Sequence, residues 1–275
     1  MCAAEIFAPN GIVTLTTDFG TRDAYLGAMK GVMLSIAPQL RIHDVAHHIE
    51  PQNVAHGATV LRGACPWFPP GTVHVAVIDP GVGTARAPVV VVAGGQAFVG
   101  PDNGLFAPVV ARLDGALVGH RIERTGELAR YLPLQPSSTF AGRDLFAPVG
   151  AVLAAGLLPP AAIGGTHTLL PLADDEPVCS AGAIAGRIAY FDHFGNAITN
   201  IATRHLAELP GAHVVRLPDE QRLALRQTYG EAAPGEVLAL IGSEGFLEIA
   251  VRDGSARERL GLHAGATIRV EGTST

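Results

Sequence analysis

The stretch VHVAVIDPGVGTARAPVVVV, residues 73–92, decides how the first half of this chain folds. An apolar run through Ile78 ends abruptly in Asp79, and a Pro-Gly-Val-Gly loop leads on to Arg86. The four valines that follow are typical of a strand covered on both faces. These residues predict two buried strands, 73–78 and 88–93, and a glycine-rich loop that carries a carboxylate and a guanidinium.

Strands and helices alternate on both sides of this stretch. Short β-rich runs at 12–15 and 41–45 are each followed by apolar residues at helical spacing. The helices are expected at about 22–36, 53–65, 105–113 and 144–155. Such alternation favours an α/β domain with a mostly parallel sheet.

The pattern changes near residue 170, where the polar, proline-containing segment LPLADDEPVCSAG begins. Beyond it, short strands separated by Gly, Pro and Asp replace the helices, which suggests a small barrel or sandwich. These strands are expected at 183–190, 197–201, 213–217, 237–241, 246–251 and 267–270. We therefore predict an N-terminal α/β domain over 1–175 and a smaller C-terminal β-barrel-like domain over 176–275.

Composition narrows the possible partners. The 275 residues are 48% hydrophobic and carry a net charge of -6, so a large core is expected but no basic surface for nucleic acid or anionic lipid. The three cysteines (Cys2, Cys65 and Cys179) form no CxxC pair, and no secretory signal is evident. The apolar stretch 145–160 is too short to span a bilayer. We expect a cytoplasmic protein with a small-molecule partner and no nucleic acid or membrane.

Ligands of parallel sheets gather outside the carboxyl ends of the strands, and three polar segments fall there. They are TTDFGTRDAY (16–25), HDVAHH (43–48) and the loop after residue 78, while STFAGRD (138–144) precedes a later helix. A carboxylate such as Asp18 can hold two vicinal hydroxyls at once. The alternative is a structural role for Asp18 or Asp23, in a turn or as a helix cap.

A metal or phosphate site is the less favoured interpretation. His43, Asp44 and His47 are possible metal ligands, but His47 and His48 point to different faces of an extended chain and no HExxH motif is present. The Pro-Gly-Val-Gly loop lacks the lysine and the length of a P-loop. We expect no metal and no cofactor.

A second group of binding-type residues lies in FDHFGNAITN, residues 191–200. Phe194 could stack on a purine, and the Asn196 amide could pair with its edge. The alternative is that His-Phe-Gly-Asn simply forms a β-turn.

Six ordered motifs carry a resemblance to one family: TTDFGTRDAYLGAMKG, IDPGVGT, PDNGL, TFAGRD, DHFGN and GFLEIA. Over about residues 13–270 the chain resembles the S-adenosyl-L-methionine hydroxide adenosyltransferases, relatives of fluorinases and chlorinases. The resemblance implies a homotrimer with active sites between the N-terminal domain of one subunit and the C-terminal domain of the next. It also implies attack of water or hydroxide on the ribose C5′ of S-adenosylmethionine, which releases adenosine and methionine without a cofactor.

The resemblance also implies a role for individual residues. Asp79 and Arg86 resemble two members of a catalytic Asp-Arg-His trio that positions the attacking water. Asp18 matches a residue that grips the ribose hydroxyls, and Asp23 one near the methionine amino group. The other implied substrate-binding residues are Tyr25, Phe140, Gly142, Asp192, Phe194, Asn196, Tyr229 against the adenine, Ser243 at the methionine carboxylate, and Glu244.

Three positions depart from the family pattern. Ala141 stands where the trio has its His, Glu244 where halogenases have Arg, and Gln52 where fluorinases have Trp. Alanine can neither donate nor relay a proton, so a binding protein with little turnover is one alternative, beside a metal-dependent hydrolase. A halogenase is a third alternative. It is disfavoured because the chain runs almost directly from Val92 to Gly100, without the fluorinase insertion, and because Asp79 would repel a halide.

Overall fold

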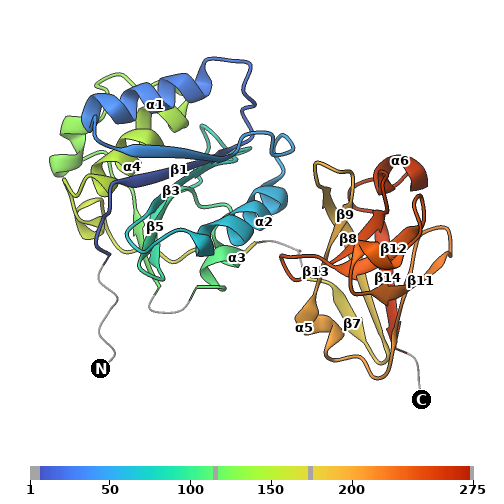
Figure 1. The fold of residues 1–275 in the computed structure, drawn as a ribbon. Helices are drawn as coiled ribbons and strands as arrows, with labels where there is room; N and C mark the ends of the chain where they lie inside the picture. The colour runs from blue at the N-terminus through green and yellow to red at the C-terminus, as the bar shows by residue number, and fades with distance from the viewer. Residues whose placement is uncertain (1–6, 114–116, 173–175, 273–275) are drawn as a thin grey trace. The chain divides into compact units, whose positions relative to one another are not determined.

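The computed structural model of the chain contains two compact units, residues 1–173 and 174–275 (Figure 1). It describes residues 7–113, 117–172 and 176–272. The predicted domain boundary after residue 175 falls on a residue outside these ranges. Each unit has its own sheet and its own hydrophobic core.

A six-stranded sheet forms the centre of the first unit, in the order β2-β1-β3-β5-β4-β6. The first four of these strands run parallel to one another, and β4 is antiparallel to both β5 and β6. The predicted α/β class is confirmed, with a mixed sheet whose parallel part is formed by β2, β1, β3 and β5. The strands are β1 (Ile12–Thr17), β2 (Arg41–Ala46), β3 (Val73–Val77), β4 (Pro88–Ala93), β5 (Gln96–Pro101) and β6 (Val118–Arg121).

The strand β5 was not predicted, and it lies between β3 and the valine-rich β4. Gly94 and Gly95 join β4 to β5 with φ angles of 56° and 69°, the left-handed pair that a tight hairpin turn requires. The valine-rich β4 therefore does not pair with β3, the strand that precedes it in the sequence, because β5 lies between them.

Helices cover both faces of this sheet (Figure 1). On one face lie α1 (Tyr25–Ile36) and α4 (Ala147–Ala154), and on the other α2 (Val54–Ala64) and the four-residue α3 (Ala107–Val110). Every residue of α4 is buried, which explains the apolar run read from the sequence. A π-helical turn, Gly142–Phe146, leads into α4, and such turns are frequent at functional sites. No helix among the described residues is both long and apolar enough to cross a membrane.

The second unit is a closed seven-stranded barrel, which confirms the predicted β-barrel-like fold. Its ring runs β8-β9-β13-β12-β11-β10-β14 and closes by pairing of β14 with β8, while β7 pairs with β8 alongside. The short helices α5 (Thr203–Leu206) and α6 (Ala256–Leu260) lie in its connections. The strands are β7 (Val178–Ser180), β8 (Ala183–Phe191), β9 (Ala197–Ala202), β10 (His213–Arg216), β11 (Arg222–Arg226), β12 (Val237–Ile241), β13 (Phe246–Val251) and β14 (Thr267–Gly272).

The packing of β5 against β3 predicts a large effect for Gly100→Ala. A Cβ at this position would lie 2.2 Å from the Ala76 carbonyl oxygen and 2.8 Å from Phe106 Cζ. We expect this substitution to lower the free energy of unfolding of the first unit by about 1–3 kcal/mol, measured by denaturant titration. Gly31→Ala is the matched control, because a Cβ there meets nothing within 4 Å and Ala favours the helix by about 0.5–1 kcal/mol. Equal stability of the two variants would contradict this account of the sheet.

Candidate functional site

Asp18 lies at the shared edge formed by the carboxyl ends of β1, β2 and β3. It directly follows β1, and its Oδ2 accepts a hydrogen bond of 2.9 Å from the Gln52 backbone N–H. Gln52 adopts φ = 65°, an uncommon left-handed conformation for a residue with a side chain. A second hydrogen bond, of 2.7 Å, runs from the Gly20 N–H to the His47 carbonyl. The loop after β2 therefore fixes the loop that carries Asp18.

Asp79 and Arg86 form the ion pair that the sequence suggested. Arg86 Nε donates to both carboxylate oxygens at 2.9 and 3.1 Å, and Nη2 also bonds Asp79 Oδ2. The pair is shielded from water, with side-chain exposures of 5% for Asp79 and 14% for Arg86. The guanidinium carbon lies 5.3 Å from the centre of the Phe146 ring, and the Asn103 amide donates to the Ile78 carbonyl at 2.9 Å. The carboxylate is thus held by a two-point contact at the end of β3.

The loop between Asp79 and Arg86 depends on its glycines. A Cβ on Gly81 would lie 3.3 Å from Arg86 Cγ, and Gly83 has φ = 81°. A Cβ on Gly83 would also come within 3.5 Å of the Ser138 carbonyl oxygen. The loop therefore lies against the segment that leads to TFAGRD, and two sequence motifs meet at this point.

An aromatic cluster lies between the first and fourth polar segments. The Tyr25 ring centre is 5.8 Å from Phe19 and 5.2 Å from Phe140. Gly142 packs beneath the cluster, since a Cβ there would lie 3.1 Å from Phe140 and 3.3 Å from Phe19. The structure brings Tyr25, Phe140 and Gly142 together. Ala141, which separates Phe140 from Gly142 in the sequence, is half-buried.

Asp23 is exposed and lies two residues before α1. The helix begins after Ala24, which is its N-cap, and no side chain caps it. The alternative of a helix-capping Asp23 is therefore wrong.

The histidine-rich segment 43–48, which begins within β2 and continues beyond it, makes structural contacts. Asp44 accepts from Lys30 Nζ at 2.7 Å, and His47 Nε2 lies 3.0 Å from the other Asp44 oxygen. Burial opposes ionisation of Asp44, but hydrogen bonds from Lys30 and His47 hold its pKa below the ordinary value. The His43 ring lies near Phe68 instead. Within the described residues, no three His, Cys, Asp or Glu side chains form a group that could hold a metal ion.

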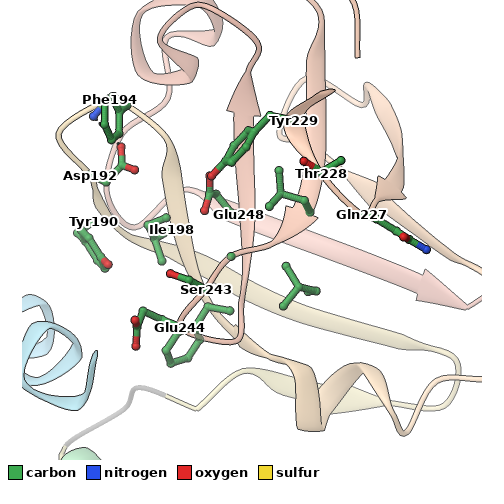
Figure 2. A pocket seen from close by; sticks show the side chains of 14 residues that line it. Tyr190, Asp192, Phe194, Ile198, Gln227, Thr228, Tyr229, Ser243, Glu244 and Glu248 are labelled. Carbon is green, nitrogen blue, oxygen red and sulfur yellow. Dashed lines mark hydrogen bonds between the residues drawn. The ribbon is translucent and has the colours of Figure 1, made fainter. Parts of the chain in front are cut away.

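The second unit contains a cavity of about 480 Å³ (Figure 2). Five of the predicted binding residues line it, and they come from three loops: Asp192, Phe194, Tyr229, Ser243 and Glu244. Side chains on alternate positions of β13 fill the barrel core, so the cavity lies against the outer surface of the barrel.

A row of four side chains on neighbouring strands forms the floor of the cavity. Tyr190 on β8 pairs with Ile198 on β9, Ile198 with Glu248 on β13, and Glu248 with Leu240 on β12. Sequence reasoning missed all four of these residues. The available signal was Glu248, an acidic residue inside the apolar strand FLEIAV.

The turn after β8 is organised by Asp192. Its Oδ1 accepts from the backbone N–H groups of Phe194 and Asn196 at 2.9 and 2.8 Å, and Oδ2 accepts from the Asn196 amide at 2.9 Å. This is the turn considered as the alternative, with Gly195 at φ = 81°. Asn196 is buried, and its contact with a purine stays a prediction, whereas Phe194 is 73% exposed at the cavity rim.

The cavity is electronegative. Its lining contains three carboxylates, Asp192, Glu244 and Glu248, and no Lys, Arg or His among the described lining residues. Burial, together with the charges of these three groups, raises the pKa of Tyr190 to about 12. Burial also raises the pKa of Glu248, although a hydrogen bond from Tyr229 opposes this and Asp192 adds to it. Such a field attracts a cationic ligand.

Comparison with known proteins matches both units. The N-terminal domain model of the SAM hydroxide adenosyltransferases matches residues 13–164, and the C-terminal domain model matches residues 186–269. The chain is similar to the (R)-S-adenosyl-L-methionine hydrolase of Salinispora tropica, with 38% identity covering 96% of this chain and 98% of the relative. A fluorinase of an Actinoplanes species is 29% identical over 95% of this chain and 97% of its own.

A solved structure shares the fold. It is an uncharacterized conserved protein from Thermotoga maritima with a TM-score of 0.83 and 36% identity, covering 94% of this chain and 99% of its own. With both domain models matched in order, the chain belongs to the SAM hydroxide adenosyltransferase family.

Proposed function

We propose that this chain hydrolyses S-adenosylmethionine to adenosine and methionine. The observation that carries the proposal is the shielded Asp79–Arg86 pair at the carboxyl end of β3, in a chain that aligns almost end to end with an S-adenosylmethionine hydrolase. The relative's name specifies the (R) form of the substrate, and we extend that preference to this chain.

The chemistry follows from the charges of the reactants. A water molecule held by the Asp79 carboxylate attacks the ribose C5′ carbon, the C–S bond breaks, and neutral methionine leaves with the bonding electron pair. Asp79 takes up the proton of the water, and Arg86 holds the carboxylate in place. A hydroxide-like nucleophile and a sulfonium neutralise each other's charge, so a dry pocket and alignment of the water with the C–S bond favour the reaction.

Recognition of the substrate is divided between the two units in this proposal. Asp18 binds the ribose hydroxyls and Asp23 the methionine amino group, beside the aromatic cluster of Tyr25 and Phe140. The cavity of the second unit takes the adenine and the rest of the methionine. We further propose a homotrimer in which the first unit of one subunit meets the second unit of the next, working in the cytoplasm on a small-molecule substrate without metal or cofactor.

Water is favoured over halide as the nucleophile. The charged pair at the carboxyl end of β3 includes an anion, Asp79, and an anion repels a halide but accepts a hydrogen bond from water. A measurement of turnover distinguishes a hydrolase from a protein that binds S-adenosylmethionine without cleaving it.

Incubation with S-adenosylmethionine should yield equal amounts of adenosine and methionine by liquid chromatography. Asp79→Asn should lower kcat by about 100-fold or more while changing the substrate Kd by less than about threefold, because the carboxylate acts mainly in the transition state. Asp219→Asn, an exposed acid in the second unit, is the control. If the wild type forms no adenosine above background at high protein concentration, the hydrolase proposal is wrong.

Ala141→His restores the residue type that completes the catalytic trio in the family. We expect kcat to rise by about 10-fold or more, since general acid–base groups contribute about 10²–10⁴-fold. Ala141→Gln supplies a side chain of similar size without a titratable ring and should leave kcat near the wild-type value. An unchanged rate for Ala141→His would mean that the missing relay does not limit turnover.

Glu244→Arg tests whether the charge at position 244 affects binding of the methionine carboxylate. An acid at this position repels that carboxylate, whereas Arg can pair with it, so KM for S-adenosylmethionine should fall by about 10-fold. Glu244→Gln removes the charge alone and should give an intermediate KM. With the decarboxylated substrate, which carries an amine but no carboxylate, the order of the three proteins should reverse. If the three proteins show the same order of KM with both substrates, the methionine carboxylate does not lie near Glu244.

A further inference from the structure

Glu248 is a buried carboxyl group in the middle of an apolar strand. It is 4% exposed on β13, between Leu247 and Ile249 of the barrel core. Burying an ionisable group is unfavourable unless it is hydrogen-bonded. Its partner is Tyr229, whose hydroxyl donates to Glu248 Oε1 at 2.5 Å, and Figure 2 shows the phenol reaching toward it along the cavity wall.

The position of the carboxyl group is closely defined. The strands on either side hold Glu248 opposite Ile198 and Leu240. A Cβ on Gly242 would lie 2.6 Å from Glu248 Oε2, so a side chain at this position would displace the carboxyl group at the end of β12. The acceptor is therefore in place before any ligand arrives.

Tyr229 differs from Glu248 because it lies on a short turn between β11 and β12, and it is 42% exposed. The ends of this turn are anchored: Arg226 Nη1 donates to the Glu231 carbonyl at 2.9 Å, and Arg252 Nη1 to the Ala232 carbonyl at 2.6 Å. These bonds hold the backbone of the turn and do not involve the ring. The hydrogen bond from the Tyr229 hydroxyl to Glu248 acts on the ring itself.

We propose that Glu248 is a positioning residue that holds the Tyr229 ring as a preformed stacking wall for the planar base of the substrate. The proposal rests on the proposed function, which supplies a substrate with an adenine. A ring fixed in advance loses no rotational freedom when the base binds, so binding is tighter. Glu248 acts through Tyr229 on substrate and product alike, and therefore on KM rather than on kcat.

The charge of Glu248 matters as well as its shape. Hydrogen bonds from a hydroxyl to an ionised carboxylate are short, about 2.5–2.7 Å, and about twice as strong as neutral ones. Burial raises the pKa of Glu248, so folding is favoured while the group is neutral and loses that advantage as pH rises through its pKa. Ligand binding has the opposite dependence, because the ionised form holds Tyr229 more firmly.

Other titratable groups also face this part of the cavity. They are Tyr190 on β8, Asp192 in the turn after β8, and Glu244 in the loop after β12. A Glu248→Gln variant keeps them all and removes only the titration of Glu248. The difference between wild type and this variant therefore isolates the contribution of one carboxyl group.

The experiment measures adenosine binding by calorimetry and S-adenosylmethionine hydrolysis for wild type, Glu248→Gln, Tyr229→Phe and the double variant. Each single variant should raise Kd and KM by about three- to tenfold with kcat within about twofold. The double variant should bind no more weakly than either single one, because both remove the same contact. Glu220→Gln, on an exposed turn near Arg216, is the matched control.

The pH dependence separates positioning from a merely structural role. At pH 7.5 Glu248→Gln should melt at the wild-type temperature or above while binding adenosine more weakly. The gap in Kd between the two proteins should close as the pH is lowered toward 5. Additive effects in the double variant, an unchanged Kd, or a loss of affinity matched by a loss of thermal stability would each overturn the proposal. If adenosine binds as expected but none is formed from S-adenosylmethionine, the proposed function fails while the positioning role stands.

Discussion

The parallel pairing of β1 with β2 and β3 is the constraint on which the first half of the site depends. It brings the carboxyl ends of three strands to one edge, and so Asp18 and Asp79, sixty-one residues apart in sequence, lie at the ends of adjacent strands. Each carboxylate is then fixed by a contact from a loop, Asp18 by the Gln52 N–H and Asp79 by the Arg86 guanidinium. The sheet places the backbone, and the loops set the direction of the side chains.

The predictable parts of the fold are those with strong local signals. The runs at β3 and β4 and the strands β12 and β13 were located nearly to the residue, because apolar patterning and flanking Gly or Asp both marked them. The strand β5 was missed because Gln96, Gly100 and Pro101 interrupt its apolar pattern. Its identity as a strand comes from pairing with β3 and β4 on either side, which is a tertiary effect.

Site residues that belong to one short sequence motif could be predicted. Site residues that come together only through the pairing of separate strands could not. The Asp79–Arg86 pair could be inferred because one glycine-rich loop joins the two residues. Tyr190 and Glu248 could not, since they are brought together through Ile198 by register between three strands. The Asn196 amide is a different case: a motif suggested a ligand contact, the structure shows the amide donating to Asp192, and the ligand contact stays a prediction.

The Gly94-Gly95 turn lies at the amino end of β5, which is the edge of the sheet opposite to Asp18 and Asp79. The Gly95 carbonyl accepts a hydrogen bond of 2.7 Å from the Gly71 N–H, and a Cβ on Gly94 would lie 3.0 Å from Leu113 Cβ, so residues inserted into that turn would disturb contacts at this edge of the sheet. The turn is therefore held by contacts that are separate from those that orient Asp18 and Asp79. A change in the length of this turn is thus expected to alter the stability of the sheet more than the geometry of the two carboxylates.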